Sequence, residues 1–235
     1  VHKPEFLANM EALGHLDLIV AKGKLALRYH CVRPSLSADK SIALREVVHP
    51  QEAEDLAERG EQFTSLDLEL RPGCTVITGA NMAGKSTFLR SLGVNYILAM
   101  AGMPVFADQL KISRFRLFSS MRTTDDLTHG ISYFNAELIR LEELLKFCKE
   151  SAEGKFCKES GEDNKEPLRT LIILDEILKG TNSLDKLNGS RKFLEAISKQ
   201  PVSGIIATHD LELSKMENDA SGKFHNYCFE IDLGT

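Results

Sequence analysis

The stretch that decides the fold runs from Gly79 to Ser86 and reads Gly-Ala-Asn-Met-Ala-Gly-Lys-Ser. It follows a predicted apolar strand, Cys74–Thr78, and opens a helix predicted over Lys85–Ala101. The pattern G-x-x-x-x-G-K-[ST] between a strand and a helix is typical of a phosphate-binding loop. Backbone N–H groups surround the phosphates, the lysine reaches the β- and γ-phosphates, and the serine hydroxyl ligates Mg²⁺. We therefore predict a nucleoside triphosphate site here.

A second apolar strand, Leu171–Leu174, ends in two adjacent carboxylates, Asp175 and Glu176. Ligands of open α/β sheets bind at the carboxyl ends of the strands, so these side chains are expected opposite the loop. Asp175 would hold Mg²⁺ through a water molecule, and Glu176 would polarise the water that attacks the γ-phosphate. Carboxylates at a strand end can also be merely solvated, but a phosphate-binding loop in the same chain favours hydrolysis.

A third apolar strand, Gly204–Ala207, is followed by Thr208, His209 and Asp210. Most single histidines are structural. At the carboxyl end of a core strand, however, His209 could hydrogen-bond the γ-phosphate or the attacking water. We therefore expect it to belong to the same site as the loop and the two carboxylates.

These strands lack polar alternation, as expected when helices cover both faces of a parallel sheet. The fold class is therefore α/β, with a mostly parallel core sheet. Further helices are predicted over Ser132–Lys149 and Leu187–Lys199, and further strands over 41–48 and 66–70. Apolar spacing also predicts an amphipathic helix from Pro4 to Lys22 that ends near Gly23.

Two domains are expected, a helical segment over residues 1–40 and an ATPase domain over 41–235. Residues 146–169 are rich in both charges, and Lys-Phe-Cys-Lys-Glu-Ser occurs at 146–151 and again at 155–160. The favoured interpretation is a solvated insertion before the next strand. A longer helix with a slipped register is the alternative.

Composition indicates a globular protein, with 43% hydrophobic and 27% charged residues. The net charge of −5 gives this segment no general attraction for nucleic acid. Five cysteines without a C-x-x-C pair argue against a disulfide framework or a zinc site and favour a reducing, cytoplasmic location. The apolar stretch 92–107 is too short and too interrupted for a membrane span. The chain is expected to be a fragment of a longer protein.

Four ordered motifs resemble those of MutS mismatch-repair ATPases. The first is the loop extended from Thr78 to Thr87, and the second is Asp125-Asp126-Leu127 with Gly130-Ile131-Ser132-Tyr133-Phe134-Asn135-Ala136-Glu137. The others are Leu174-Asp175-Glu176-Ile177 with Gly180-Thr181 and Asp185, and Ala207-Thr208-His209 with Glu212-Leu213. The resemblance covers the chain from about Ser41 to the C-terminus.

The resemblance implies a P-loop NTPase of the ABC-ATPase type whose two nucleotide sites are completed across a dimer. Ser132 would then face the γ-phosphate of the opposite subunit, and Phe63 would stack on adenine. Helix capping and core packing explain these two residues equally well. The resemblance implies that nucleotide is bound by Gly79, Ala80, Asn81, Met82, Ala83, Gly84, Lys85, Ser86, Thr87, Phe63 and Ser132. It implies that Ser86 and Asp175 are the metal ligands. The implied catalytic residues are Glu176, Lys85 and His209.

The expected function is therefore an ATP- and Mg²⁺-dependent ATPase and dimerisation domain of a MutS-like mismatch repair protein. It would form a homodimer or pair with a MutS-like partner and couple nucleotide state to DNA bound largely by regions outside this chain. Ala80, Ala83, Tyr133 and Leu178-Lys179 depart from the usual family pattern. The alternative is therefore a MutS-like module that acts in recombination or as a nucleotide-gated scaffold. A transporter-type ABC module is disfavoured because Leu-Ser-Gly-Gly-Gln is absent.

Overall fold

The core of the molecule is a five-stranded sheet in which every neighbouring pair is parallel. The computed structural model describes residues 3–60, 66–80, 83–121, 133–154, 167–178, 183–218 and 222–230. The strand order is β6 (Phe115–Met121), β7 (Arg169–Asp175), β8 (Val202–Ala207), β4 (Gly73–Gly79) and β9 (Phe224–Phe229). The prediction of an α/β fold with a mostly parallel sheet is thus confirmed.

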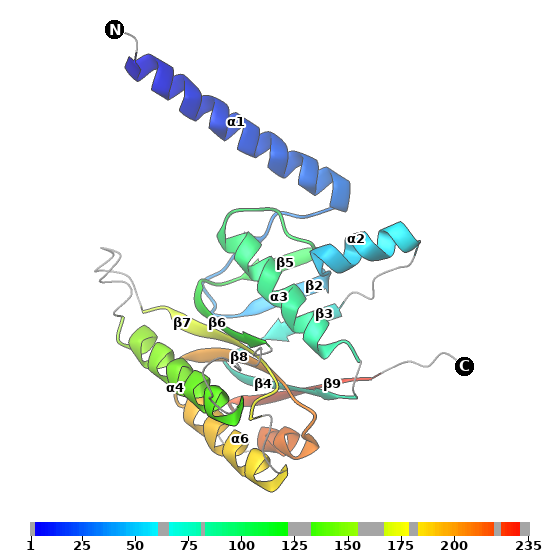
Figure 1. Cartoon of the computed structure of the whole chain (residues 1–235), viewed down its shortest axis with the longest axis vertical. Coiled ribbons are helices and arrows are strands. Elements are labelled where there is room, and N and C mark those ends of the chain that lie inside the picture. Colours follow the sequence, from blue (N-terminus) through cyan, green and yellow to red (C-terminus); the bar gives the residue numbers. More distant parts are fainter. Residues whose placement is uncertain are drawn as a thin grey trace.

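Helices cover both faces of this sheet (Figure 1). On one face, α3 (Lys85–Met100) buries Phe88, Leu89 and Leu92 against Ile77, Leu171, Ile173 and Ile205. On the other face lie α4 (Tyr133–Ala152), α6 (Ser183–Ser198) and the 3₁₀ segment η2 (Leu211–Asn218). These bury Leu144, Leu194 and Leu213 against Val76, Ile172 and Ile206. Neighbouring strand residues therefore face opposite cores, which explains why the strands are apolar throughout.

A second, four-stranded sheet lies on the far side of α3 (Figure 1). Its order is β1 (Ser35–Leu36), β5 (Gln109–Ile112), β2 (Ile42–Val47) and β3 (Leu66–Leu70). The β2 strand is antiparallel to both of its neighbours. Ile42, Leu70 and Ile112 belong to the same core as α3. The helix that begins at the predicted phosphate loop is therefore packed between two sheets.

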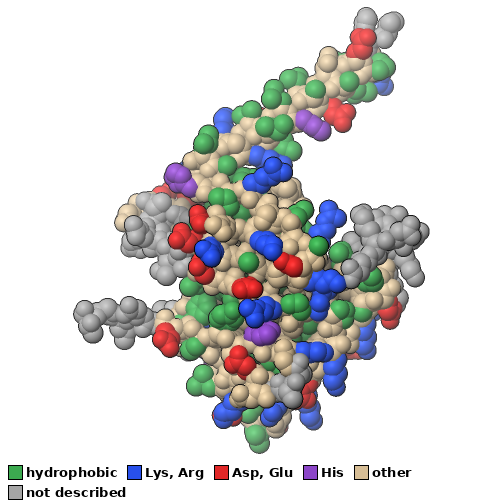
Figure 2. Space-filling view, turned by 180° about the vertical axis from the view of Figure 1, so that it is seen from behind, with side chains coloured by type: hydrophobic (Ala, Val, Ile, Leu, Met, Phe, Trp, Pro, Cys, Tyr) green, Lys and Arg blue, Asp and Glu red, His purple; other side chains and the backbone are tan. Residues whose placement is uncertain are grey.

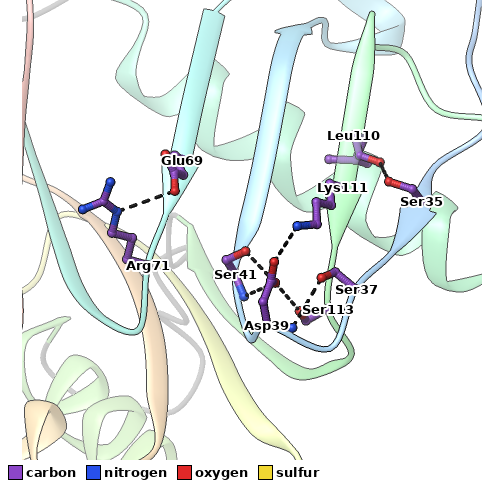
Figure 3. A network of polar contacts seen from close by, with 9 residues as sticks. All are labelled: Ser35, Ser37, Asp39, Ser41, Glu69, Arg71, Leu110, Lys111 and Ser113. Atoms are coloured by element: carbon purple, nitrogen blue, oxygen red, sulfur yellow. Dashed lines mark hydrogen bonds and ion pairs between the residues drawn. The ribbon is translucent and has the colours of Figure 1, made fainter.

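A polar network fixes the turn between β1 and β2 (Figure 3). The ammonium of Lys111, on β5, lies 2.5 Å from Asp39 Oδ2, and the Ser41 hydroxyl donates to Asp39 Oδ1 at 2.7 Å. These hydrogen bonds, from Lys111 first and then from the neighbouring serines, hold the pKa of Asp39 well below its usual range. The carboxylate thus ties this turn to β5.

The first helix differs from its predicted bounds and environment. It runs as α1 from Lys3 to Tyr29, so the prediction that it ends near Gly23 is wrong. Residues 24–29 are mostly good helix formers, and one glycine costs a helix only about 1 kcal/mol. All of α1 is described, and none of its residues is buried. Hydrophobic side chains are visible along its surface in Figure 2.

The charged stretch 146–169 begins inside a helix. The α4 helix extends to Ala152, so the whole first copy of the repeated hexapeptide is helical, and β7 begins at Arg169. The second copy, 155–160, lies outside the described residues. The acidic run before β3 contains helix α2 (Pro50–Arg59). None of the described helices combines the length and apolar character that crossing a membrane requires.

Candidate functional site

The predicted phosphate loop joins the inner strand β4 to the first turn of α3. Gly84 is the N-cap of α3 and has a φ of 87°, a left-handed conformation that suits glycine. The Phe88 N–H donates to the Gly84 carbonyl at 2.9 Å, which closes the first helical turn. The loop therefore delivers the N-terminal end of a helix, with its free N–H groups, to the carboxyl edge of the sheet.

The Lys85 side chain folds back onto this loop. Its ammonium donates to the carbonyl oxygens of Gly79 and Ala80, both at 2.7 Å, and the residue is only 6% exposed. Burial lowers the pKa of Lys85, while the negative charges of Asp175 and Glu176 act in the opposite direction. A buried cation held mainly by carbonyl dipoles would be stabilised further by an anion placed beside it.

Three strand ends meet opposite the loop. Asp175, at the end of β7, pairs in register with Ala207 at the end of β8. The Glu176 N–H then donates to the Ala207 carbonyl at 2.9 Å, and the Thr208 N–H donates to the carbonyl of Ile77 on β4 at 2.9 Å. The parallel register of β7, β8 and β4 thus places the acidic pair and the histidine at one edge, as expected from the sequence.

These segments enclose a pocket with a volume of 440 Å³. Lys85, Ser86, Asp175, Glu176 and His209 all line it. The rest of its lining comprises Ala83, Gly84, Thr87, Ala207 and Thr208. The structure therefore brings together the predicted cationic, hydroxyl, acidic and imidazole groups around one cavity of the size that a small ligand occupies.

Glu176 lies in a restrained position within this pocket. Its φ of 60° falls in the left-handed region, which a non-glycine residue rarely adopts. Oε1 lies 2.6 Å from the ammonium of Lys186, and Oε2 lies 3.8 Å from Nε2 of His209. Lys186 belongs to the first turn of α6, and sequence reasoning did not single it out. No local pattern marks such a residue, because the contact depends on how α6 packs against the sheet.

The pocket offers oxygen ligands that fit Mg²⁺. Ser86 contributes a hydroxyl and Asp175 a carboxylate, and Mg²⁺ usually takes one or two protein ligands and completes its shell with water and phosphate oxygens. Within the described ranges, no group of three or more His, Cys, Asp or Glu could hold a metal by itself. The donor set therefore suits a metal that arrives with a phosphate ligand.

Several predicted residues lie outside the described part of the chain. These are Asn81 and Met82 of the loop, Phe63 and Ser132. Gly79 and Ala80 are described, and both interact with Lys85 through their carbonyl groups.

Leu178 shows how a departure from the family pattern is accommodated. Its φ of 56° lies in the left-handed region, a conformation that costs a leucine roughly 1–2 kcal/mol. The side chain is buried, and a Cβ on Gly189 would lie only 2.6 Å from its Cδ1. Burying a leucine contributes about 2 kcal/mol, which offsets this backbone cost.

Gly79 is sterically required, and we predict that Gly79→Ala destabilises the fold. Its φ is 142°, and an added Cβ would lie 2.5 Å from the backbone oxygen of Phe229 on β9. Because strand backbone cannot easily move aside, the free energy of unfolding should fall by about 3 kcal/mol. Chemical denaturation measures this effect. Gly14→Ala on α1, where a Cβ meets nothing within 4 Å, is the matched control, and equal stability of the two variants would contradict the prediction.

Comparison with known proteins agrees with this geometry. Residues 75–153, which include most of β4, the loop and α3, match the family model described as MutS domain V. The chain is similar to proteins named DNA mismatch repair protein MutS: it is 32% identical to that of Thermus aquaticus over 87% of this chain and 22% of the relative. It is 33% identical to the protein of Azorhizobium caulinodans, over 88% of this chain and 21% of that relative. It is 30% identical to the protein of Chloroflexus aurantiacus, over 93% of this chain and 21% of that relative.

The chain spans about a fifth of the length of these relatives. The matched residues contain the phosphate loop and the helix that follows it, and the similarity to the three relatives extends over most of the chain. The chain therefore contains a MutS domain V, the ATPase domain of MutS mismatch repair proteins.

Proposed function

We propose that this chain binds ATP in the pocket between the β4–α3 loop and the ends of β7 and β8, and that it hydrolyses the γ-phosphate bond. The observation that carries the proposal is the convergence of Lys85, Asp175 and Glu176 on one 440 Å³ cavity. A cation that reaches phosphate, a carboxylate for a metal and a second carboxylate for water are the groups that phosphoryl transfer to water requires.

Each group has a distinct proposed task. Lys85 would exchange its hydrogen bonds with the Gly79 and Ala80 carbonyls for the β- and γ-phosphate oxygens. Glu176 would accept a proton from the attacking water, and His209, 3.8 Å away, would contact the same water or the γ-phosphate. Ser86 and Asp175 would hold Mg²⁺, which when bound draws negative charge from the phosphate oxygens. In addition, Phe63 would stack on adenine.

The site is further proposed to act in pairs. By the family resemblance, Ser132 of one copy would face the γ-phosphate held by a second copy or a MutS-like partner. The parent protein would use this dimer to couple ATP turnover to DNA bound elsewhere, in mismatch repair. Residues 1–40 would form the end of the helical region that precedes the ATPase domain. The MutS names of the relatives and the domain V match support these proposals.

The test is the dependence of ATP turnover on Mg²⁺ and on protein concentration. Phosphate release should require Mg²⁺ and stop when EDTA is added. If each site is completed by a second copy, the rate per chain should rise about tenfold or more as protein concentration passes the dimer Kd, because the dimer fraction follows mass action. Steady-state phosphate release over a concentration series, with sedimentation on the same samples, measures both quantities.

Ser132→Ala is the variant that probes the shared site. It should lower the rate above the dimer Kd and leave the much lower rate of the monomer unchanged. A rate per chain that stays constant across the series, together with a neutral Ser132→Ala, would rule out a shared site. ATP turnover that persists in EDTA would rule out a requirement for Mg²⁺.

A further inference from the structure

Lys186 forms a shielded ion pair with the carboxylate proposed as the general base. The Lys186 ammonium lies 2.6 Å from Glu176 Oε1, and both side chains are only 19% exposed. This contrasts with the other ion pairs of α6 and η2, such as Arg191 with Glu195, whose side chains are 65% and 49% exposed. Exposed pairs contribute little, whereas a shielded pair at this distance restricts both partners.

The two carboxylate oxygens of Glu176 have different neighbours. Oε1 is held by Lys186 on the α6 side, while Oε2 lies on the His209 side of the pocket, 3.8 Å from Nε2. The Glu176 backbone is fixed independently, by its left-handed φ of 60° and by the N–H bond to Ala207. A glutamate has three side-chain torsions, so a fixed backbone alone does not orient its carboxylate. The contact between Lys186 and Oε1 restrains the carboxylate itself.

We propose that Lys186 is a positioning residue for ATP hydrolysis: its ammonium holds Oε1 of Glu176 so that Oε2 presents itself to the attacking water. This inference rests on the proposed function, because it assigns Lys186 a part in the same step. Lys186 itself is not among the residues that line the pocket. It acts through the orientation of Glu176, whose productive geometry must be held to within a fraction of an ångström.

The α6 helix does not depend on this ion pair for its place in the fold. Phe193, Leu194 and Ile197 are buried on its inner face, and they pack in the same core as Ile172, Leu174 and Ile206. Replacing Lys186 by methionine keeps the apolar stem and removes only the charge and the hydrogen-bond donors. The substitution therefore isolates the interaction with Glu176.

The test compares steady-state ATP hydrolysis by four chains. Lys186→Met should lower kcat about tenfold, as expected for loss of a group that orients a catalytic residue, with KM and ATP affinity within twofold of the unmodified chain. Lys186→Arg should restore most of kcat, because a guanidinium can hold the same oxygen. Lys192→Met, an exposed lysine on the same helix, is the matched control and should leave both constants unchanged.

A double variant separates positioning from other roles. If Lys186 acts only through Glu176, then Lys186→Met combined with Glu176→Gln should turn over no more slowly than Glu176→Gln alone. Additive losses would overturn the proposal, as would an unchanged or increased kcat in Lys186→Met. A Lys186→Met chain that fails to fold, or that loses ATP affinity, would assign the residue a structural or binding role and overturn it as well.

The same experiment distinguishes failure of the wider proposal. If the unmodified chain hydrolyses no ATP, or if Glu176→Gln retains full turnover, the proposed function itself is wrong. If the unmodified chain is active, Glu176→Gln is inactive and Lys186→Met matches the unmodified chain, only the role of Lys186 is wrong.

Discussion

Glu176→Gln should bind ATP with nearly unchanged affinity and hydrolyse it about 10²–10⁴ times more slowly. The amide has the same shape as the carboxylate, and its carbonyl oxygen can still accept a hydrogen bond from Lys186, which lies 2.6 Å from Oε1 in the present structure. It cannot accept a proton from water at neutral pH, so the loss should fall on kcat. If the sites are shared, the variant should also accumulate as an ATP-bound dimer.

Three measurements check this expectation. Single-turnover phosphate release reports the chemical step, equilibrium binding of a fluorescent ATP analogue reports affinity, and sedimentation with ATP reports dimer accumulation. Glu195→Gln makes the same change at an exposed position on α6 and should leave all three unchanged. Turnover of Glu176→Gln within a few-fold of the unmodified chain would transfer the role of base to another group.

Lys85→Ala should weaken ATP binding about 10²–10⁴-fold, which is the second large effect. A lysine that donates charge-assisted hydrogen bonds to phosphate contributes about 1.5–3 kcal/mol for each bond, and two such bonds are expected at the β- and γ-phosphates. The Lys85 ammonium already lies beside the loop, 2.7 Å from the Gly79 and Ala80 carbonyl oxygens. Binding of ATP therefore requires only that the ammonium exchange these oxygens for phosphate oxygens.

Calorimetric titration with ATP and Mg²⁺ measures this loss. Lys85→Met separates charge from packing, because it retains the apolar stem that fills the loop, and it should lose as much affinity as Lys85→Ala. Lys199→Ala, at an exposed position just after α6, serves as the control. Undiminished ATP affinity in both Lys85 variants would mean that the loop does not hold the triphosphate.

The elements that the sequence predicts correctly are those whose local residue pattern matches their burial in the fold. The strands β4, β7 and β8 are buried on both faces, so their residues form unbroken apolar runs that no other element explains as well. The glycine-rich loop lies between β4 and α3 because a phosphate-binding loop follows a strand and opens a helix. The sequence alone therefore predicts one site that contains Lys85, Asp175, Glu176 and His209.

Elements at the margins of the sheets were missed for physical reasons. The edge strand β9 carries His225, Asn226 and Cys228 among its six residues, so it lacks an apolar run. The other edge strand, β6, contains Arg116 and two serines. Edge strands need less apolar sequence because part of their surface meets solvent. The ion pair between Lys186 and Glu176 also could not be predicted from the sequence, because it depends on the packing of α6.

The exposure of α1 has a mechanical consequence. Its C-terminal end is held to α2 by the hydrogen bond from the Tyr29 hydroxyl to Glu54 at 2.7 Å, and Glu52 of α2 accepts a hydrogen bond from Thr87 at the start of α3, at 3.4 Å. Its 27 residues form a rod about 40 Å long, at 1.5 Å per residue. A tilt of about 10° at the anchored end would sweep the free end through about 7 Å, so small shifts of α2 and of the start of α3 would be magnified severalfold at the tip.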